Sequence, residues 1–287
     1  MVVPNHTTVE PIDLRHQGVE GVIGVYLLET DDGPALFDCG PATAYGSLRE
    51  QVDVRELRHL LLSHIHLDHA GAAGALVREN PGLQVHVSEV GAPHVVDPTR
   101  LIASARRIYG DTLDRLFGEP EPVPQENVHV AGHRELGLVS FPTPGHASHH
   151  VCYLDEDGTL FAGDACGVRL LPARHVLPHA PPPDVDVEAW ERTFDDILRH
   201  QPERLALIHF GVVEELEEVA EHVERARDYL RVWSGRVERG MGEEEFVECA
   251  RHDYEVAEGE YDERLQLAAP FEQSYAGLER YWRKRRE

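Results

Sequence analysis

Short apolar segments separated by turn residues occupy the first two hundred positions of the chain. Their length, their content of β-branched and aromatic residues and their flanking Gly, Pro and Asp residues predict β-strands. The predicted strands cover residues 21–29, 34–40, 57–63, 83–88, 138–145, 149–154 and 159–165. Between the last two, the sequence DEDG at 155–158 predicts a hairpin turn, because Gly158 can adopt a positive φ.

Apolar residues at helical spacing alternate with these strands. They predict helices over residues 43–52, 70–80, 98–109, 186–200 and 214–233. After about residue 240 strand patterns stop, and amphipathic helices ending in a basic tail are predicted. The Pro-rich, acidic segment 118–128 is predicted to be an exposed connector, and 171–186 is predicted to be a longer irregular loop of the kind that often borders a site. The pattern indicates a mixed domain over residues 1–235 and a helical extension over 236–287.

The size of the chain and its apolar content fit one large domain with an appendage. Of its 287 residues 41% are hydrophobic, which suffices for a sizeable core. No apolar run approaches the roughly 20 residues of a membrane-spanning helix, and we expect a cytoplasmic protein without a membrane partner. The four cysteines lie far apart without a CxxC pair, so free thiols are expected.

The charge balance is strongly acidic. Basic residues number 27 against 52 acidic ones, a net charge of −25, and Lys284 is the only lysine. This balance disfavours a nucleic-acid partner, because phosphates would be repelled. Two explanations stay open: adaptation to high salt, which screens repulsion within an acidic surface, or ordinary acidity combined with a preference for arginine codons.

The sequence SHIHLDHAG, residues 63–71, places four ligand-type side chains in one turn: His64, His66, Asp68 and His69. The two histidines lie two positions apart, so in an extended segment leaving a strand they point the same way. Neutral imidazoles and carboxylate oxygens are the ligands that a borderline divalent metal prefers. The spacing HxHxDH therefore predicts metal binding rather than a solvated loop.

Three later residues occur in matching contexts, each directly after an apolar strand. His146 follows a strand and a Pro-Gly turn, Asp164 ends the segment TLFAGD, and His209 ends LALIH. Together with HxHxDH, this ordered set resembles the metallo-β-lactamase superfamily over residues of about 20–212, including its glyoxalase II-like and lactonase-like hydrolases. The resemblance implies an α+β fold, a four-layer αβ/βα sandwich of two mostly antiparallel sheets with helices outside.

The resemblance also implies a site with two divalent metal ions, zinc in the first place and manganese or iron as alternatives. His64, His66 and His146 would bind one metal, Asp68, His69 and His209 the second, and Asp164 would bridge both. The family reaction is hydrolysis, in which a metal-bridging hydroxide attacks an ester-like bond such as that of a lactone or thioester. Asp68 would in addition act as a catalytic group that orients the water.

Alternatives to this reaction are open on sequence alone. Persulfide dioxygenases of the superfamily share HxHxDH but use one iron, bound by the equivalents of His64, His146 and Asp164. A phosphodiesterase of the same fold, or a metal-binding scaffold without catalysis, is also compatible. For partners we expect a small-molecule substrate and allow for a homodimer.

Further residues are candidates for supporting roles. Asp38, in ALFDCG, matches a family position that orients a ligand histidine, although an ordinary turn aspartate is an alternative. Cys166 is interpreted as a small buried thiol, and His149 and His150 as structural or supporting neighbours of the site. The loop residues Arg169, His175 and His179 are explained by substrate contact or by solvation alike. Arg106, Arg107 and Tyr109 are predicted on a surface helix face, with lining of the pocket as the alternative, and the tail RYWRKRRE is predicted to be solvated.

Overall fold

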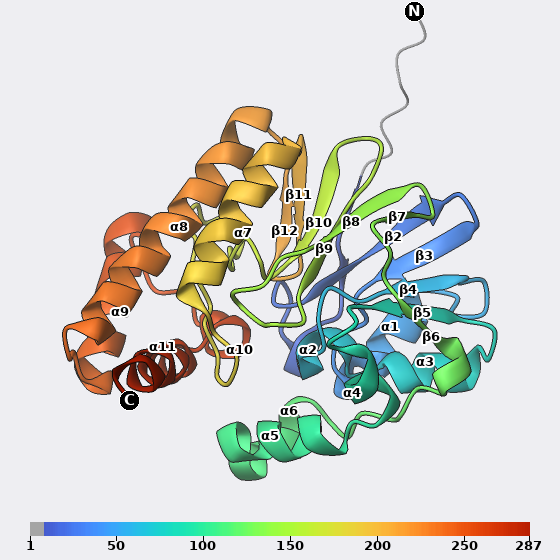
Figure 1. The fold of residues 1–287 in the computed structure, drawn as a ribbon, viewed down its shortest axis with the longest axis horizontal. Coiled ribbons are helices and arrows are strands. Elements are labelled where there is room, and N and C mark those ends of the chain that lie inside the picture. Colours follow the sequence, from blue (N-terminus) through green and yellow to red (C-terminus); the bar gives the residue numbers. More distant parts are fainter. Residues whose placement is uncertain (1–8) are drawn as a thin grey trace, which may run out of the picture.

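The computed structural model describes residues 9–287 and contains two six-stranded sheets (Figure 1). In the first sheet the strands follow chain order: β1 (Ile12–Asp13), β2 (Gly24–Thr30), β3 (Gly33–Phe37), β4 (His59–Leu61), β5 (Gln84–Val87) and β6 (Val128–Val130). The second has the order β12 (Gly211–Val213), β11 (Arg204–Leu207), β10 (Thr159–Gly163), β9 (Val151–Leu154), β8 (Leu138–Pro142) and β7 (Arg134–Glu135). Every predicted strand is present, with shorter bounds.

Strand direction differs between the sheets. In the second sheet only β10 and β11 are parallel, as the prediction of mostly antiparallel sheets requires. In the first sheet that prediction is wrong, because β3, β4, β5 and β6 pair in parallel. Parallel neighbours need a long crossover between them, and here each crossover contains at least one helix.

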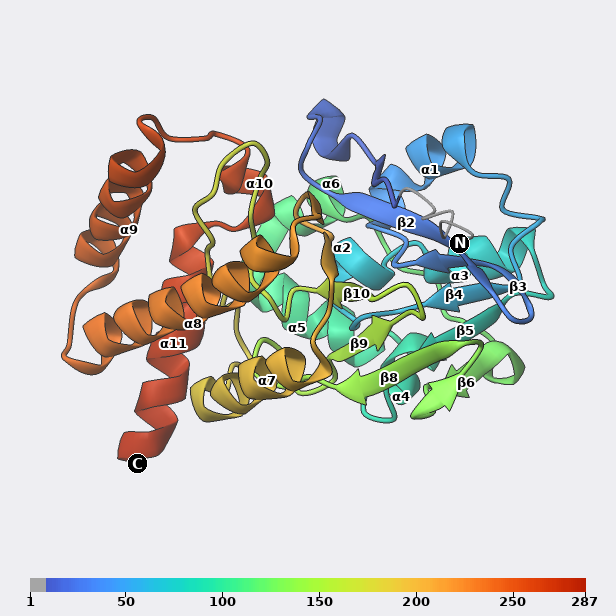
Figure 2. The same cartoon turned by 90° about the horizontal axis from the view of Figure 1, so that it is seen from above.

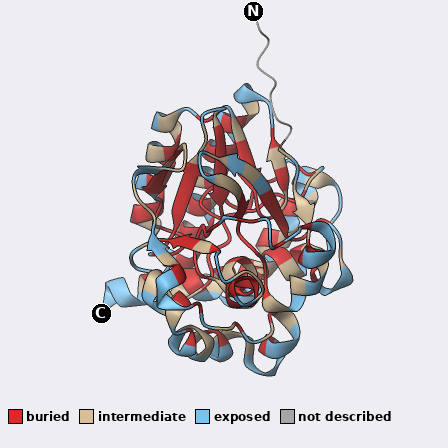
Figure 3. Ribbon diagram, turned by 90° about the vertical axis from the view of Figure 1, so that its right-hand side faces the viewer, coloured by how far each residue is buried: buried red, intermediate tan, exposed pale blue. Residues whose placement is uncertain are grey.

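The sheets pack face to face through aromatic side chains. Phe37 of the first sheet contacts Phe161 and Tyr153 of the second, with ring centroids 5.3 and 6.0 Å apart. The buried hydroxyl of Tyr26 lies 2.6 Å from the carbonyl oxygen of Leu207, a bond that joins the two sheets. Buried residues concentrate between the sheets (Figure 3), which places the hydrophobic core there.

Helices form the outer layers and most of the C-terminal part. The helices are α1 (Tyr45–Gln51), α2 (Leu67–Ala70), α3 (Ala73–Glu79), α4 (Ala92–Val96), α5 (Thr99–Tyr109), α6 (Leu113–Leu116), α7 (Val187–His200), α8 (Leu216–Glu238), α9 (Glu243–Glu258), α10 (Leu265–Ala268) and α11 (Phe271–Arg286). Short 3-10 turns are η1 (His16–Gly18), η2 (Ala42–Ala44), η3 (Gly110–Thr112) and η4 (Gln125–Asn127). From above, α7 and α8 lie beside the second sheet, and α1 and α3 beside the first (Figure 2). This is the four-layer sandwich that the resemblance implies.

The predicted helix 70–80 is divided into α2 and α3. Two glycines in this region show why its side chains must be small. A Cβ atom at Gly71 would lie 2.9 Å from Cα of Pro41, and one at Gly74 would lie 2.2 Å from the carbonyl oxygen of Glu121. Two other chain segments therefore pack directly on this backbone. One of them is the segment 118–128, which is exposed as predicted at five positions, whereas Pro120, Val123 and Asn127 in it are buried.

The C-terminal helices share the core of the sandwich. Trp233 of α8 contacts Phe246 of α9 and Phe271 of α11, with ring centroids 5.2 and 5.7 Å apart. The predicted division at residue 235 lies inside α8 and stays a prediction. All four cysteines are free, as expected, and among the described helices none has the length and apolarity needed to cross a bilayer.

Candidate metal centre

The HxHxDH segment leaves β4 and enters α2. His64 and His66 lie on the connecting segment, and His66 retains an extended backbone with φ −60° and ψ 152°. Asp68 and His69 follow on α2. The strand, the extended connection and one helical turn thus direct four ligand-type side chains to the same edge of the sandwich.

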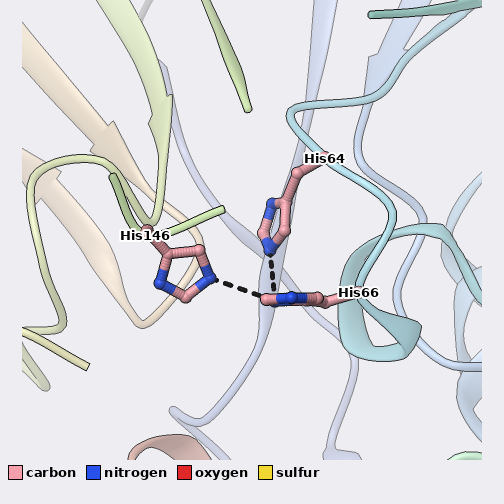
Figure 4. A group of neighbouring side chains, drawn as sticks. All are labelled: His64, His66 and His146. Atoms are coloured by element: carbon pink, nitrogen blue, oxygen red, sulfur yellow. Dashed lines mark hydrogen bonds between the residues drawn. The ribbon is translucent and has the colours of Figure 1, made fainter. Parts of the chain in front are cut away.

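Three histidines form a first group at this edge (Figure 4). His64 Nε2 lies 2.9 Å from His66 Nδ1, which lies 3.0 Å from His146 Nε2. His146 comes from the other sheet, on the loop between β8 and β9. Three imidazole nitrogens so close together on buried or half-buried rings are suited to bind one cation.

Asp68, His69 and His209 form a second group. His69 Nε2 lies 3.9 Å from Asp68 Oδ2, and His209 Nε2 lies 3.5 Å from the same oxygen. The rings of His69 and His209 are fully buried, whereas the Asp68 side chain keeps 21% of its surface exposed. Asp68 is therefore a member of the second group that solvent can reach.

The Asp164 carboxylate lies between the two groups. Its Oδ2 atom lies 3.5 Å from His146 Nε2 in the first group, and its Oδ1 atom lies 3.4 Å from His69 Nε2 in the second. The end of β10 places Asp164 here, where its N–H donates to His150 Nε2 at 3.1 Å. Gly163 makes this approach possible, because a Cβ atom there would lie 2.6 Å from both His150 and Ser63. One carboxylate thus faces both groups.

Four of the site histidines have a hydrogen-bond partner on the ring nitrogen that points away from the site. In the neutral ring these outer partners fix the tautomer, so the inward Nε2 atom carries the lone pair that a metal needs. The outer pairs are His64 Nδ1 with Ser63 Oγ (2.9 Å), His69 Nδ1 with Asp38 Oδ2 (2.8 Å), His146 Nδ1 with the carbonyl of His179 (2.8 Å) and His209 Nδ1 with the carbonyl of Val22 (2.8 Å). The hydrogen bond expected from Asp38 to a site histidine is among them.

Several inward atoms have no partner of their own. His69 Nε2, His209 Nε2 and Asp164 Oδ1 are buried without a hydrogen bond. A buried polar atom left unpaired costs free energy, and three such atoms converging on one space indicate that a ligand completes them. Nitrogen and carboxylate donors fit a divalent cation.

The pKa values of these groups follow their surroundings. Burial is the largest cause that lowers the pKa of His64, His66 and His146, and it holds these rings in the neutral form that binds metals. Burial also opposes charge on His69 and His209, but Asp164 and Asp68 outweigh it and raise the pKa of both. The second group therefore has a strongly negative environment that attracts a cation.

A pocket of about 530 Å³, its open mouth included, leads to this edge. Its inner end is formed by ligand-type side chains, His66, Asp68, Asp164 and His179. Its other described lining residues are Leu67, Leu101, Ser104, Ala105, Ile108, Tyr109, Phe117, Pro181, Pro182 and Pro183. The site can thus receive a small molecule from an apolar approach.

The structure decides between the alternatives left open for two groups of supporting residues. The loop 171–186 is not simply solvated: His175 and His179 are buried under the C-terminal helices, and Arg169 just before it is buried in an ion pair 3.1 Å from Glu218. Tyr109 lines the pocket rather than a surface face, while Arg106 on the same helix is exposed. In both cases the covering element lies far away in sequence.

Other contributors carried no sequence signal. Ser63 resembles any polar residue ending a strand, yet its hydroxyl donates to Asp38 Oδ2 at 2.6 Å. Ser274 of α11 accepts a hydrogen bond from the Ala180 N–H at 3.1 Å, across 94 positions of sequence. Only the position of Ser63 beside the histidine motif could have suggested its role.

Comparison with known proteins agrees with this geometry. The family model described as the metallo-beta-lactamase superfamily matches residues 19–209. YobT of Bacillus subtilis is 29% identical over 51% of this chain and 63% of its own length. ST1585 of Sulfurisphaera tokodaii is 26% identical over 66% of this chain and 73% of its own length. A hydroxyacylglutathione hydrolase of Shewanella halifaxensis is 25% identical over 49% of this chain and 42% of its own length. The thioesterase pkgB of Emericella nidulans is 29% identical over 48% of this chain and 34% of its own length.

Solved structures share the fold. The crystal structure of ST1585 superposes with a TM-score of 0.60 over 71% of this chain and 80% of that chain, at 24% identity. TTHA1429 of Thermus thermophilus superposes with 0.62 over 92% and 89%, at 19% identity. TTHA1623, in a di-iron-bound form, superposes with 0.54 over 70% and 93%, at 26% identity.

The chain spans less than two thirds of YobT and less than half of the two named hydrolases. The family match itself covers more than half of this chain and contains all seven predicted site residues. With its sandwich fold and its cluster of His and Asp side chains, this chain belongs to the metallo-β-lactamase superfamily.

Proposed function

We propose that this protein is a hydrolase with two divalent metal ions that cleaves an ester-like bond of a small molecule. The observation that carries the proposal is the position of Asp164, whose two oxygens face different groups of histidines. His64, His66 and His146 would hold one metal, Asp68, His69 and His209 the other, and Asp164 would contact both. When bound, such a pair of cations activates water near neutral pH and polarises the bond under attack.

The side chains of the protein have distinct tasks in this proposal. Asp68 lines the pocket and is partly exposed, so it is placed to orient the attacking water and to accept its proton. Asp38 and the carbonyl of His179 hold the rings of His69 and His146 in fixed orientations. The apolar pocket walls reduce the contact of the site with bulk water, which strengthens the electrostatic interactions inside.

The relatives support this class of reaction. Two of them are named as a hydroxyacylglutathione hydrolase and a thioesterase. For the metal, the histidine-rich donor set favours zinc, and the di-iron form of TTHA1623 makes iron the main alternative.

The test combines metal analysis with a hydrolysis screen on the purified, metal-loaded protein. The screen covers lactones, thioesters, phosphodiesters and β-lactams, and we expect about two metal ions per chain and turnover of a thioester or lactone. His66→Ala should abolish turnover and lower the metal content. The matched control is His252→Ala, because His252 is an exposed histidine on α9.

Three outcomes would contradict the proposal. One iron per chain, with oxygen uptake on glutathione persulfide, would identify a dioxygenase instead. Preference for a phosphodiester would change the substrate class. Full metal loading without any hydrolysis in the screen would favour a scaffold.

A further inference from the structure

The apolar wall of the pocket comes from an insertion between β5 and β6. This insertion contains α4, α5 and α6. Val95 of α4 belongs to the main core, whereas α5 and α6 pack through a second, small hydrophobic cluster: Leu67, Ala105, Leu113 and Phe117. Leu67 belongs to α2, the helix that carries Asp68 and His69. The insertion is therefore attached directly beside the candidate metal centre.

Helix α5 directs one face into the pocket. Leu101, Ser104, Ala105 and Ile108 line it at spacings of three and four residues, which places them on one side of the helix. Leu101 and Ile108 are only half-buried, so they lack complete cover within the chain. The seven residue steps from Leu101 to Ile108 span about 10 Å along the helix axis. The face therefore has about the length of a medium-chain acyl group.

The opposite wall is stiff. Pro181, Pro182 and Pro183 form it, and proline has a restricted backbone. Helix α11 supports this wall at close range, since a Cβ atom at Gly277 would lie 1.9 Å from the carbonyl oxygen of Ala180. Two apolar walls thus face each other across a slot that leads to Asp164.

The slot offers no positive side chain to an anionic substrate. Of the described residues that line it, none is Lys or Arg, and Asp68 and Asp164 contribute negative charge. Arg106, on the other side of α5, is paired with Asp114 at 2.7 Å. Proteins that bind carboxylates or phosphates commonly use Arg or Lys, so this slot favours a substrate whose distal part is neutral.

We propose, on the basis of the hydrolase function above, that the substrate is a thioester or ester with a neutral, apolar acyl chain of medium length. The chain lies between α5 and Pro181–Pro183, with the acyl carbon at the Asp68 and Asp164 end. In hydrolysis a bond forms between the water oxygen and the acyl carbon, and the carbon–sulfur or carbon–oxygen bond breaks. The products are a carboxylic acid and a thiol or alcohol, which takes up a proton.

A series of acyl thioesters of N-acetylcysteamine tests the chain preference. From acetyl to octanoyl, kcat/KM should rise by as much as about fourfold per buried methylene. The suberyl thioester has the same chain length with a terminal carboxylate, and its kcat/KM should be at least a hundredfold below that of the octanoyl thioester. Equal rates for acetyl and octanoyl, or for suberyl and octanoyl, would overturn the inference.

A charge placed in the slot should change the preference. In Ile108→Arg the ratio of octanoyl to suberyl kcat/KM should fall at least tenfold. Ala103→Arg is the matched control, since Ala103 is exposed on the same helix and outside the pocket lining. An unchanged ratio in Ile108→Arg, with a native circular dichroism spectrum, would also overturn the inference.

A binding measurement separates this inference from the hydrolase proposal. Octanamide, a neutral analogue, should bind the metal-free protein in calorimetry, acetamide should not, and Ile108→Arg should weaken octanamide binding at least tenfold. If no thioester is hydrolysed but octanamide binds, the hydrolase proposal fails and the apolar slot stands. If thioesters are hydrolysed but octanamide does not bind, the inference alone fails.

Discussion

Asp38 shows how a single side chain can organise the site. It is fully buried, adopts a positive φ of 52°, and accepts hydrogen bonds from the His69 ring and from the Ser63 N–H and hydroxyl. The Ser63 hydroxyl in turn lies 2.9 Å from His64 Nδ1. One carboxylate therefore orients a histidine of each group.

Replacing Asp38 with Asn should weaken metal binding by about 10- to 100-fold. The two oxygens of Asp38 accept three hydrogen bonds. An amide keeps the size of the carboxylate but replaces one of these oxygens with a donor, so the hydrogen bond that fixes the tautomer of the His69 ring is weakened or lost. Competition with a zinc chelator measures the affinity. Asp157→Asn, in an exposed turn, is the control, and equal affinities in the two variants would contradict this role.

His222 should make stability dependent on pH without touching the site. It is fully buried on α8, its Nε2 lies 3.0 Å from the carbonyl of Cys166, and burial lowers its pKa to about 3. Between pH 6.5 and 3 the unfolded chain binds a proton that the folded chain does not. The contribution of the neutral His222 to stability is therefore fully present above pH 6.5 and is lost as the pH decreases from 6.5 to 3.

Urea unfolding of the metal-free protein at pH 7 and pH 5 measures this effect. His222→Gln keeps a donor for the Cys166 carbonyl but does not titrate, so its free energy of unfolding should fall by about 2 kcal/mol less than that of the wild type. Identical losses in both proteins would show that His222 does not contribute.

Helix α11 acts on the site through one peptide group. The N–H of the His179–Ala180 peptide donates to Ser274 Oγ at 3.1 Å, and its carbonyl accepts from His146 Nδ1 at 2.8 Å. A helix at the end of the chain thus determines the orientation of a candidate ligand. None of the described pocket-lining residues belongs to α11, so this helix supports the wall formed by Pro181–Pro183 from behind.

Replacing Ser274 with Ala should lower metal affinity about tenfold, because the peptide loses its anchor and a buried N–H is left unpaired. Chelator competition gives the affinity, and urea unfolding of the metal-free variant gives the stability. Ser47→Ala, on α1, is the control. A loss of stability without any change in metal affinity would indicate a purely structural serine.

At the scale of the whole molecule, periodicity predicted the strands and helices and the family resemblance implied the sandwich, but the direction of pairing in the first sheet was not predictable. Short apolar segments between turn residues indicate strands, but they do not show how these strands are distributed between sheets. Whether neighbouring strands run parallel depends on how the crossovers pack, and helices such as α4 and α6, with four or five residues, are too short to give a clear pattern.

The acidity of the whole molecule should make its stability sensitive to salt. A net charge of −25 causes repulsion across the surface, which added ions screen. The melting temperature of the metal-free protein should rise from low salt to molar KCl. A melting temperature indifferent to salt would contradict this expectation and the interpretation of the acidity as an adaptation to high salt.

Local sequence patterns predicted most of the candidate site. The spacing HxHxDH and three residues at strand ends identify all seven side chains that meet at one edge of the sandwich. Ligand-type residues at strand ends are recognisable in sequence because the strand pattern stops where they begin. The buried loop with His179, the apolar face of α5 and the anchor Ser274 were not recognisable. Their roles depend on contacts between residues far apart in sequence, such as the 94 positions between Ala180 and Ser274, and only the packed chain brings these together. The sequence by itself therefore determined which ligand-type residues form the site, whereas tertiary packing decided the shape and polarity of its pocket.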